Sequence, residues 1–82
     1  MSPLTVGSVV LPRGVLERIG LWRGVEMNDG RVSFTDDVMG FLEDVPGVVV
    51  RVAGDKVLVL AREALGWTYG ANLDVVLEET RP

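Results

Sequence analysis

The 82-residue chain contains no cysteine and no histidine. Without cysteine the chain can form no disulfide and has no thiol nucleophile or thiolate metal ligand. Without histidine it lacks the commonest general base and the commonest zinc ligand. We therefore expect no catalytic residues, no metal site and no cofactor, and we do not expect an enzyme.

Long apolar runs are also missing, since none reaches the roughly 20 residues that a membrane-spanning helix needs. The first residues lack the basic and apolar regions of a signal peptide. These absences predict a cytoplasmic protein without membrane association. The length predicts one domain over residues 1–82, and the 48% of hydrophobic residues is enough for a packed core. Because so small a domain buries a limited share of its surface, we expect a homo-oligomer, most simply a dimer.

Positive charge is scarce and unevenly placed along the chain, whose net charge is −4. Before residue 35, four arginines stand against three acidic residues, whereas after it four basic residues stand against nine acidic ones. The negative total argues against general affinity for nucleic acid. The first part of the chain keeps a small basic excess, which leaves room for a local arginine contact.

Most of the chain has the residue pattern of β-strands separated by tight turns. The Asn28-Asp29-Gly30 turn is a strong hairpin signal because these residues accept positive φ, and residues 53–55 form a second such turn. Residues 67–70 are predicted to form a loop. Strands are expected over 6–11, 25–27, 31–34, 48–52, 56–60 and 72–78.

Helical spacing predicts two or three short helices. Pro12 suits a first helical turn and Gly20 a helix end, so a helix is expected over 13–19, with Val15 and Ile19 on one face. A single helical turn is expected over 61–65.

The longest predicted helix covers residues 36–45. Thr35 would be its N-cap, and Asp36 and Asp37 would lie in its first turn, where the helix dipole favours anions. Its core stripe would have the spacing i, i+3, i+4, i+7, formed by Val38, Phe41, Leu42 and Val45.

Two segments of the chain resemble each other. Residues 16–20 followed by Gly24 are similar to residues 62–66 followed by Gly70. This similarity suggests half-repeats 5–35 and 47–79, joined by the helix over 36–45. The expected fold is therefore mainly β (α+β), a small barrel with two or three short helices and a possible internal two-fold β-α-β repeat.

Residues 7–26 resemble the AbrB-type swapped-hairpin (SpoVT-AbrB) DNA-binding domain, and the likeness extends over about 5–35. It rests on Leu11-Pro12, on Arg18-Ile19-Gly20-Leu21 and on Gly24, followed by the turn at 28–30. The resemblance implies a dimer of intertwined hairpins, or a single-chain pseudo-dimer in which the second half of the chain is the partner. Its function would be that of a transcriptional regulator or an antitoxin-like protein. It also implies contact with double-stranded DNA through arginines of the strand–helix segment. The matching residues are Arg13, Arg18 and Arg23, whose planar guanidinium groups suit phosphate or guanine edges.

A second, weaker resemblance links residues 16–24 and 49–64 to the FeoA-type SH3-like barrel. It implies a non-enzymatic protein-interaction module, such as a scaffold or adaptor. Under that interpretation the aromatic residues Trp22, Trp67 and Tyr69 form the interface to a protein partner. The alternative is that the two tryptophans cap the ends of a barrel core.

Overall fold

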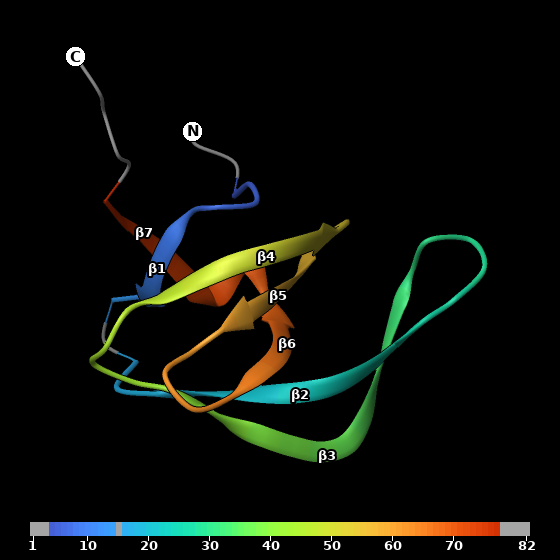
Figure 1. Ribbon diagram of the computed structural model, residues 1–82, viewed down its shortest axis with the longest axis horizontal. Helices are drawn as coiled ribbons and strands as arrows, with labels where there is room; N and C mark the ends of the chain where they lie inside the picture. The colour runs from blue at the N-terminus through green and yellow to red at the C-terminus, as the bar shows by residue number, and fades with distance from the viewer. Residues whose placement is uncertain (1–3, 15, 78–82) are drawn as a thin grey trace.

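The computed structural model describes residues 4–14 and 16–77, and in this part of the chain the backbone forms seven strands and one 3₁₀ helix (Figure 1). In chain order they are β1 (Val9–Pro12), β2 (Ile19–Glu26), β3 (Val32–Leu42), β4 (Gly47–Ala53), β5 (Lys56–Leu60), β6 (Leu65–Tyr69), η1 (Gly70–Asn72) and β7 (Leu73–Leu77).

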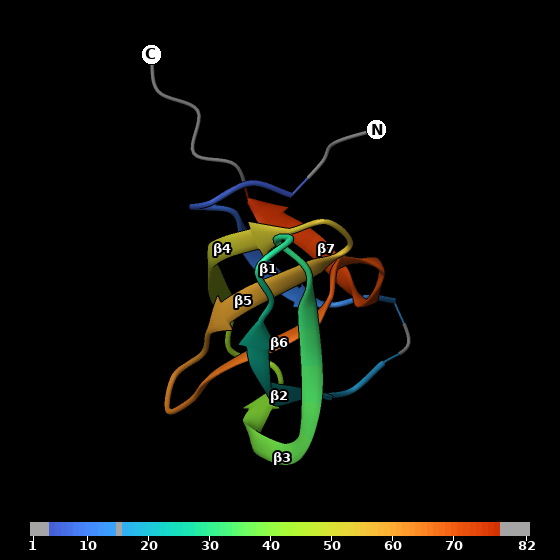
Figure 2. The same ribbon diagram turned by 90° about the vertical axis from the view of Figure 1, so that its right-hand side faces the viewer.

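The strands form one sheet in the order β3-β2-β6-β5-β4-β1-β7, and all neighbours are antiparallel. The sheet curls into a half-barrel, with β3 and β7 as its two edges (Figure 2). The prediction of a mainly β, barrel-like fold is confirmed. The predicted short α-helices are absent from residues 4–14 and 16–77, and η1 had not been predicted. No helix in this range is long and apolar enough to cross a membrane.

Branched aliphatic residues fill the concave side of the sheet. Because side chains alternate across a strand, Val57 and Val59 of β5 point inward beside Val49 of β4. The core cluster consists of Val10, Ile19, Leu21, Leu42, Val49, Val57, Val59, Ala61 and Leu73.

Strand β3 replaces most of the helix predicted over 36–45. Of the four residues in the expected stripe only Leu42 is buried, whereas Val38, Phe41 and Val45 are 40–44% exposed. Leu42 lies opposite Ile19 in the β2–β3 ladder, which carries it into the core. The helix prediction is wrong because cross-strand packing of a β-hairpin outweighed a local spacing that both structures can accommodate.

Thr35 makes the hydrogen bond expected of an N-cap, but in a strand. Its hydroxyl accepts the N–H of Asp37 at 3.2 Å and donates to the carbonyl of Arg23 at 3.1 Å. The register of β2 and β3 shifts at this point, so the bond stabilises a bulge in β3. Such side-chain-to-backbone bonds serve bulges and caps alike.

The other two predicted helical segments are connections. Residues 13–18 link β1 to β2, and there the N–H of Leu16 donates to the carbonyl of Arg13; Val15 lies outside the described residues. Pro12 ends β1 and does not begin a helix. Residues 61–64 form the turn from β5 to β6, closed by a 2.7 Å hydrogen bond from the Ala61 N–H to the Ala64 carbonyl.

Several strand predictions are confirmed with small shifts. The turn at 28–30 closes the β2–β3 hairpin, where Gly30 has φ of +88° and the Met27 N–H donates to the Arg31 carbonyl. Strand β5 covers the predicted residues, and β1, β4 and β7 overlap theirs. The loop predicted over 67–70 is instead the end of β6 and the start of η1. The half-repeats stay a prediction of the sequence.

Candidate functional site

The β2–β3 hairpin projects from the sheet as an arm (Figure 1). Trp67 of β6 packs against its base, since a Cβ on Gly24 would lie 2.6 Å from Trp67 Cδ1 and 2.8 Å from Val32 Cγ1. Trp67 is only 4% exposed. The structure therefore places Trp67 under the hairpin, where its ring packs against this chain and is closed to a partner.

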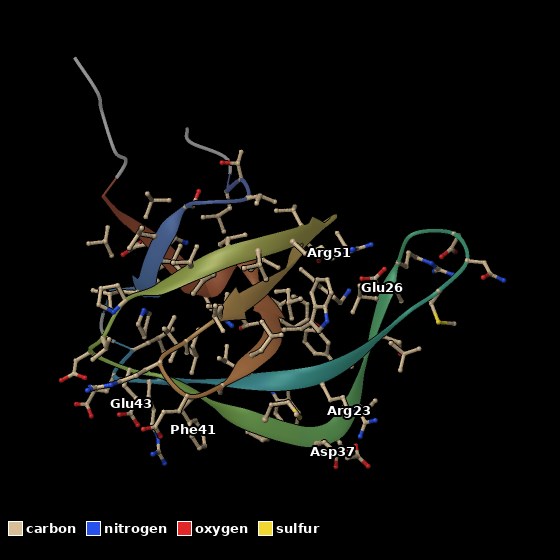
Figure 3. The ribbon with its side chains drawn as sticks, in the orientation of Figure 1. Arg23, Glu26, Asp37, Phe41, Glu43 and Arg51 are labelled. Carbon is tan, nitrogen blue, oxygen red and sulfur yellow. The ribbon has the colours of Figure 1, made fainter. Side chains whose placement is uncertain are left out.

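An ion pair also ties the hairpin to β4. Arg51 points toward Glu26, and Arg51 Nε lies 2.6 Å from Glu26 Oε2 (Figure 3). Both side chains stay well exposed, so the pair adds little to stability. The buried tryptophan, with its large apolar area, is the main anchor of the hairpin.

A hollow of about 380 Å³ lies between the hairpin, β6 and η1. This volume falls within the range of small ligand sites. None of its lining residues carries a charge, and three of them are aromatic. The lining consists of Ile19, Gly20, Trp22, Phe34, Thr68, Tyr69 and Asn72. We call it the aromatic pocket.

Two rings form one wall of the aromatic pocket. Phe34 and Tyr69 lie with ring centroids 5.1 Å apart and planes tilted by 58°, a favourable aromatic geometry. Lys56, opposite Tyr69 in the β5–β6 ladder, places its Nζ 5.4 Å from the Tyr69 centroid and 5.8 Å from that of Phe34. This cation stabilises the pair by a cation–π interaction.

The aromatic pocket contains two of the three aromatic residues that the sequence singled out. Trp22 is half-buried and Tyr69 is exposed, so both rings can be reached from solvent. Phe34 was not predicted as a site residue, because the pattern after the turn at 28–30 indicates only a strand there. Its partner lies 35 positions along the chain, and no local pattern brings the two together.

The three arginines predicted to bind DNA lie in three places, each beside a carboxylate. Arg13 and Arg18 come from the two ends of the β1–β2 connection and Arg23 from β2, and their side chains are 60–64% exposed. The nearest N–O distances are 3.2 Å for Arg13–Asp74, 3.7 Å for Arg18–Glu43 and 3.4 Å for Arg23–Asp37. Each carboxylate offsets the positive field that would attract a phosphate backbone.

Other chemistry finds little support in the described residues. Within 4–14 and 16–77, no three acidic side chains are placed to hold a metal ion. Comparison with family models, with curated proteins and with solved structures finds no match for this chain. What the fold and site define is therefore a class: an antiparallel half-barrel with an uncharged aromatic pocket beside a projecting hairpin.

Proposed function

We propose that this protein is a non-enzymatic interaction module whose aromatic pocket binds an extended, uncharged segment of a partner protein. The observation that carries the proposal is the pocket itself, in which Trp22, Phe34 and Tyr69 surround a hollow without a charged lining residue. Exposed tryptophan and tyrosine are the residues that most often dominate protein interfaces.

The strand connections support the same class. The meander β4–β5–β6 is followed by η1, after which β7 returns to pair with β1. The FeoA-type resemblance of the sequence implies an SH3-like barrel, and a barrel-like sheet of antiparallel strands is compatible with that fold. A fold alone does not give a function, so the argument rests on the pocket and the fold only favours it.

The chemistry of the pocket indicates what kind of segment fits. Flat aromatic walls suit the polyproline II helix, which is pre-formed and loses little entropy on binding. The pocket also contains groups that can donate hydrogen bonds to the backbone carbonyls of such a segment. They are the indole N–H of Trp22, the hydroxyl of Tyr69 and the side-chain amide of Asn72. A proline-containing peptide is therefore the first probe.

The test is a titration of ¹⁵N-labelled protein with the peptide Ala-Pro-Pro-Ala-Pro-Pro-Ala, followed by NMR. We expect the Trp22 indole signal to shift, and Tyr69→Ala to weaken binding by about tenfold, as for an aromatic anchor. Phe41→Ala is the matched control, because Phe41 is as exposed as Tyr69, at 44%, but lies outside the pocket. If both variants bind alike, or if the shifts avoid the pocket, the proposal fails.

DNA binding and the homodimer stay predictions of the sequence. The pairing of Arg13, Arg18 and Arg23 with carboxylates gives the DNA interpretation less support than the pocket gives a protein partner. Exposed ion pairs are weak, however, and a duplex could replace them. A gel-shift experiment, described below, therefore separates the two functions.

A further inference from the structure

Strand β3 is an edge strand, and its outer side has no partner strand in the described part of the chain. Its 11 residues make it the longest strand of the sheet. Such an edge presents a row of unpaired N–H and C=O groups that can template another strand. Proteins either protect such edges or use them to bind extended segments.

Acidic residues bracket the apolar part of this edge. Asp36 and Asp37 precede residues 38–42, and Glu43 and Asp44 follow them. We call these two pairs the acidic brackets. Between these brackets, Val38, Met39 and Phe41 are 43–49% exposed. The edge therefore combines accessible apolar side chains with two negative ends.

The brackets argue against a second copy of the chain as the occupant. An antiparallel copy that set residues 38–42 against themselves would place Asp36 and Asp37 opposite Glu43 and Asp44 of the copy. Like charges directly across a ladder destabilise the pairing. The same brackets would favour a strand with a basic residue at each end.

A hollow of about 420 Å³ adjoins this edge and can receive a side chain of the incoming strand. It is lined by residues 39–41 of β3, residues 43–45 after it, and residues 62–64 of the β5–β6 turn. Its charged residues are Glu43, Asp44 and Glu63 against Arg62, an acidic excess.

The protein already shows at this edge the contact that a basic partner would make. The guanidinium carbon of Arg18 lies 4.3 Å from the Phe41 ring centroid, and Arg18 Nη1 lies 3.7 Å from Glu43 Oε2. Phe41 and Glu43 lie close together beside the same stretch (Figure 3). A ring and a carboxylate thus form one cation-binding arrangement, which Arg18 of this chain occupies and which a basic residue of the partner would have to take over.

We propose that the free edge of β3 binds an extended basic segment of another protein by strand addition. The segment carries alternating apolar residues between two lysines or arginines, placed to meet the two acidic brackets. Asp37 and Glu43 are six residues apart, about 20 Å in an extended chain, and the basic residues of the segment would replace Arg23 and Arg18 as their ion-pair partners. The site lies outside the aromatic pocket and does not depend on the function proposed for it.

The probe is the peptide Arg-Val-Thr-Val-Thr-Val-Arg, titrated into ¹⁵N-labelled protein. We expect amide shifts along residues 36–44 and binding that weakens as salt is added. A peptide with glutamate in place of both arginines, and one that is N-methylated at all five central residues, should not bind. N-methylation removes the N–H groups of the incoming strand and leaves the protein unchanged.

Charge reversals on the protein provide a second test of the proposal. Asp36→Lys and Asp44→Lys should each weaken binding about fivefold, the size expected when an exposed attraction becomes a repulsion. Asp55→Lys is the matched control, because Asp55 is 77% exposed in the β4–β5 turn, outside residues 36–44 and outside the hollow beside them, and should change nothing. Tyr69→Ala should also leave the affinity intact, which separates this site from the pocket.

Three results would overturn the proposal: the acidic peptide binds as well as the basic one, the N-methylated peptide keeps its affinity, or no amide of residues 36–44 shifts. Equal effects of Asp36→Lys and Asp55→Lys would show that only net charge matters, and would count equally against a site on β3.

Discussion

Strands β2 and β6 approach each other closely where Gly66 faces Leu21. A Cβ on Gly66 would lie 2.7 Å from Leu21 Cβ, 2.8 Å from Leu21 C and 3.0 Å from Leu21 O. Leu21 is fully buried, and two of these atoms belong to its backbone. No flexible side chain can move aside, so Gly66→Ala must displace one strand from the other.

The loss of stability expected for Gly66→Ala can be estimated from the cost of adding a methyl group to a packed core. An added methyl group in a packed core costs about 1–3 kcal/mol, and rigid backbone neighbours favour the upper end, about 3 kcal/mol. A domain of this length has a free energy of unfolding of about 4–12 kcal/mol. A loss of that size should lower the melting temperature by about 12–24 °C.

The measurement is urea unfolding followed by tryptophan fluorescence and circular dichroism. Gly20→Ala is the matched control, because a Cβ there would meet Trp22 and Val38 side-chain atoms at 3.4 Å or more, which is ordinary contact. We expect this control to change the free energy of unfolding by less than about 1 kcal/mol. The reasoning is refuted if Gly66→Ala unfolds at the same urea concentration as Gly20→Ala.

Three other predictions follow from the contacts described above. Trp67→Ala should lower the free energy of unfolding by about 3–5 kcal/mol, since it removes the ring beneath the hairpin; a loss under about 1 kcal/mol in urea unfolding would contradict that role. Arg51→Ala should cost less than about 1 kcal/mol, because its pair with Glu26 is exposed, and the cost should shrink in high salt. Duplex DNA should show no gel shift at about 50 mM salt; a shift that Arg13→Ala with Arg18→Ala abolishes would favour the DNA-binding hypothesis instead.

Strands β1, β4, β5 and β7 were predictable because their signals are local. Asn28-Asp29-Gly30 and Gly54 sit at tight turns, and Gly30 and Gly54 have φ of +88° and +63°. Valine-rich stretches beside such turns have few alternatives to strands. Residues 56–60 show this best, since β5 begins and ends where the pattern predicts.

The helix over 36–45 was not separable from a strand by pattern alone. Its stripe includes Val38 and Leu42, which are four apart and so share a face in either structure. Contacts with segments distant in the sequence favour the strand over the helix. Leu42 packs opposite Ile19, and Gly40 leaves room for Ala64 of the β5–β6 turn. A spacing argument contains no information about either contact.

The aromatic pocket was half predictable for the same reason. Trp22 and Tyr69 can be singled out by residue type. Whether an aromatic side chain packs in the core or lines a surface pocket depends on its burial, which residue type does not give. Trp67 lies directly opposite Trp22 in the β2–β6 ladder and is buried, although both were candidates for the same role. Phe34 joins the site only because the hairpin brings it to Tyr69.

The bulge in β3 is what allows one strand to serve two surfaces. Gly24 pairs with Phe34 and Trp22 with Val38, so β3 has two more residues than β2 between these pairs. On one side of the bulge Phe34 meets Tyr69 at the end of β6, and on the other Gly40 meets Ala64 just before β6 begins. The hairpin is thus held against both ends of β6, and the bend takes up the extra length. The aromatic pocket lies at one end of this contact and the acidic edge at the other. The two proposed surfaces therefore draw on different side chains of β3, so each can be tested by substitutions that spare the other.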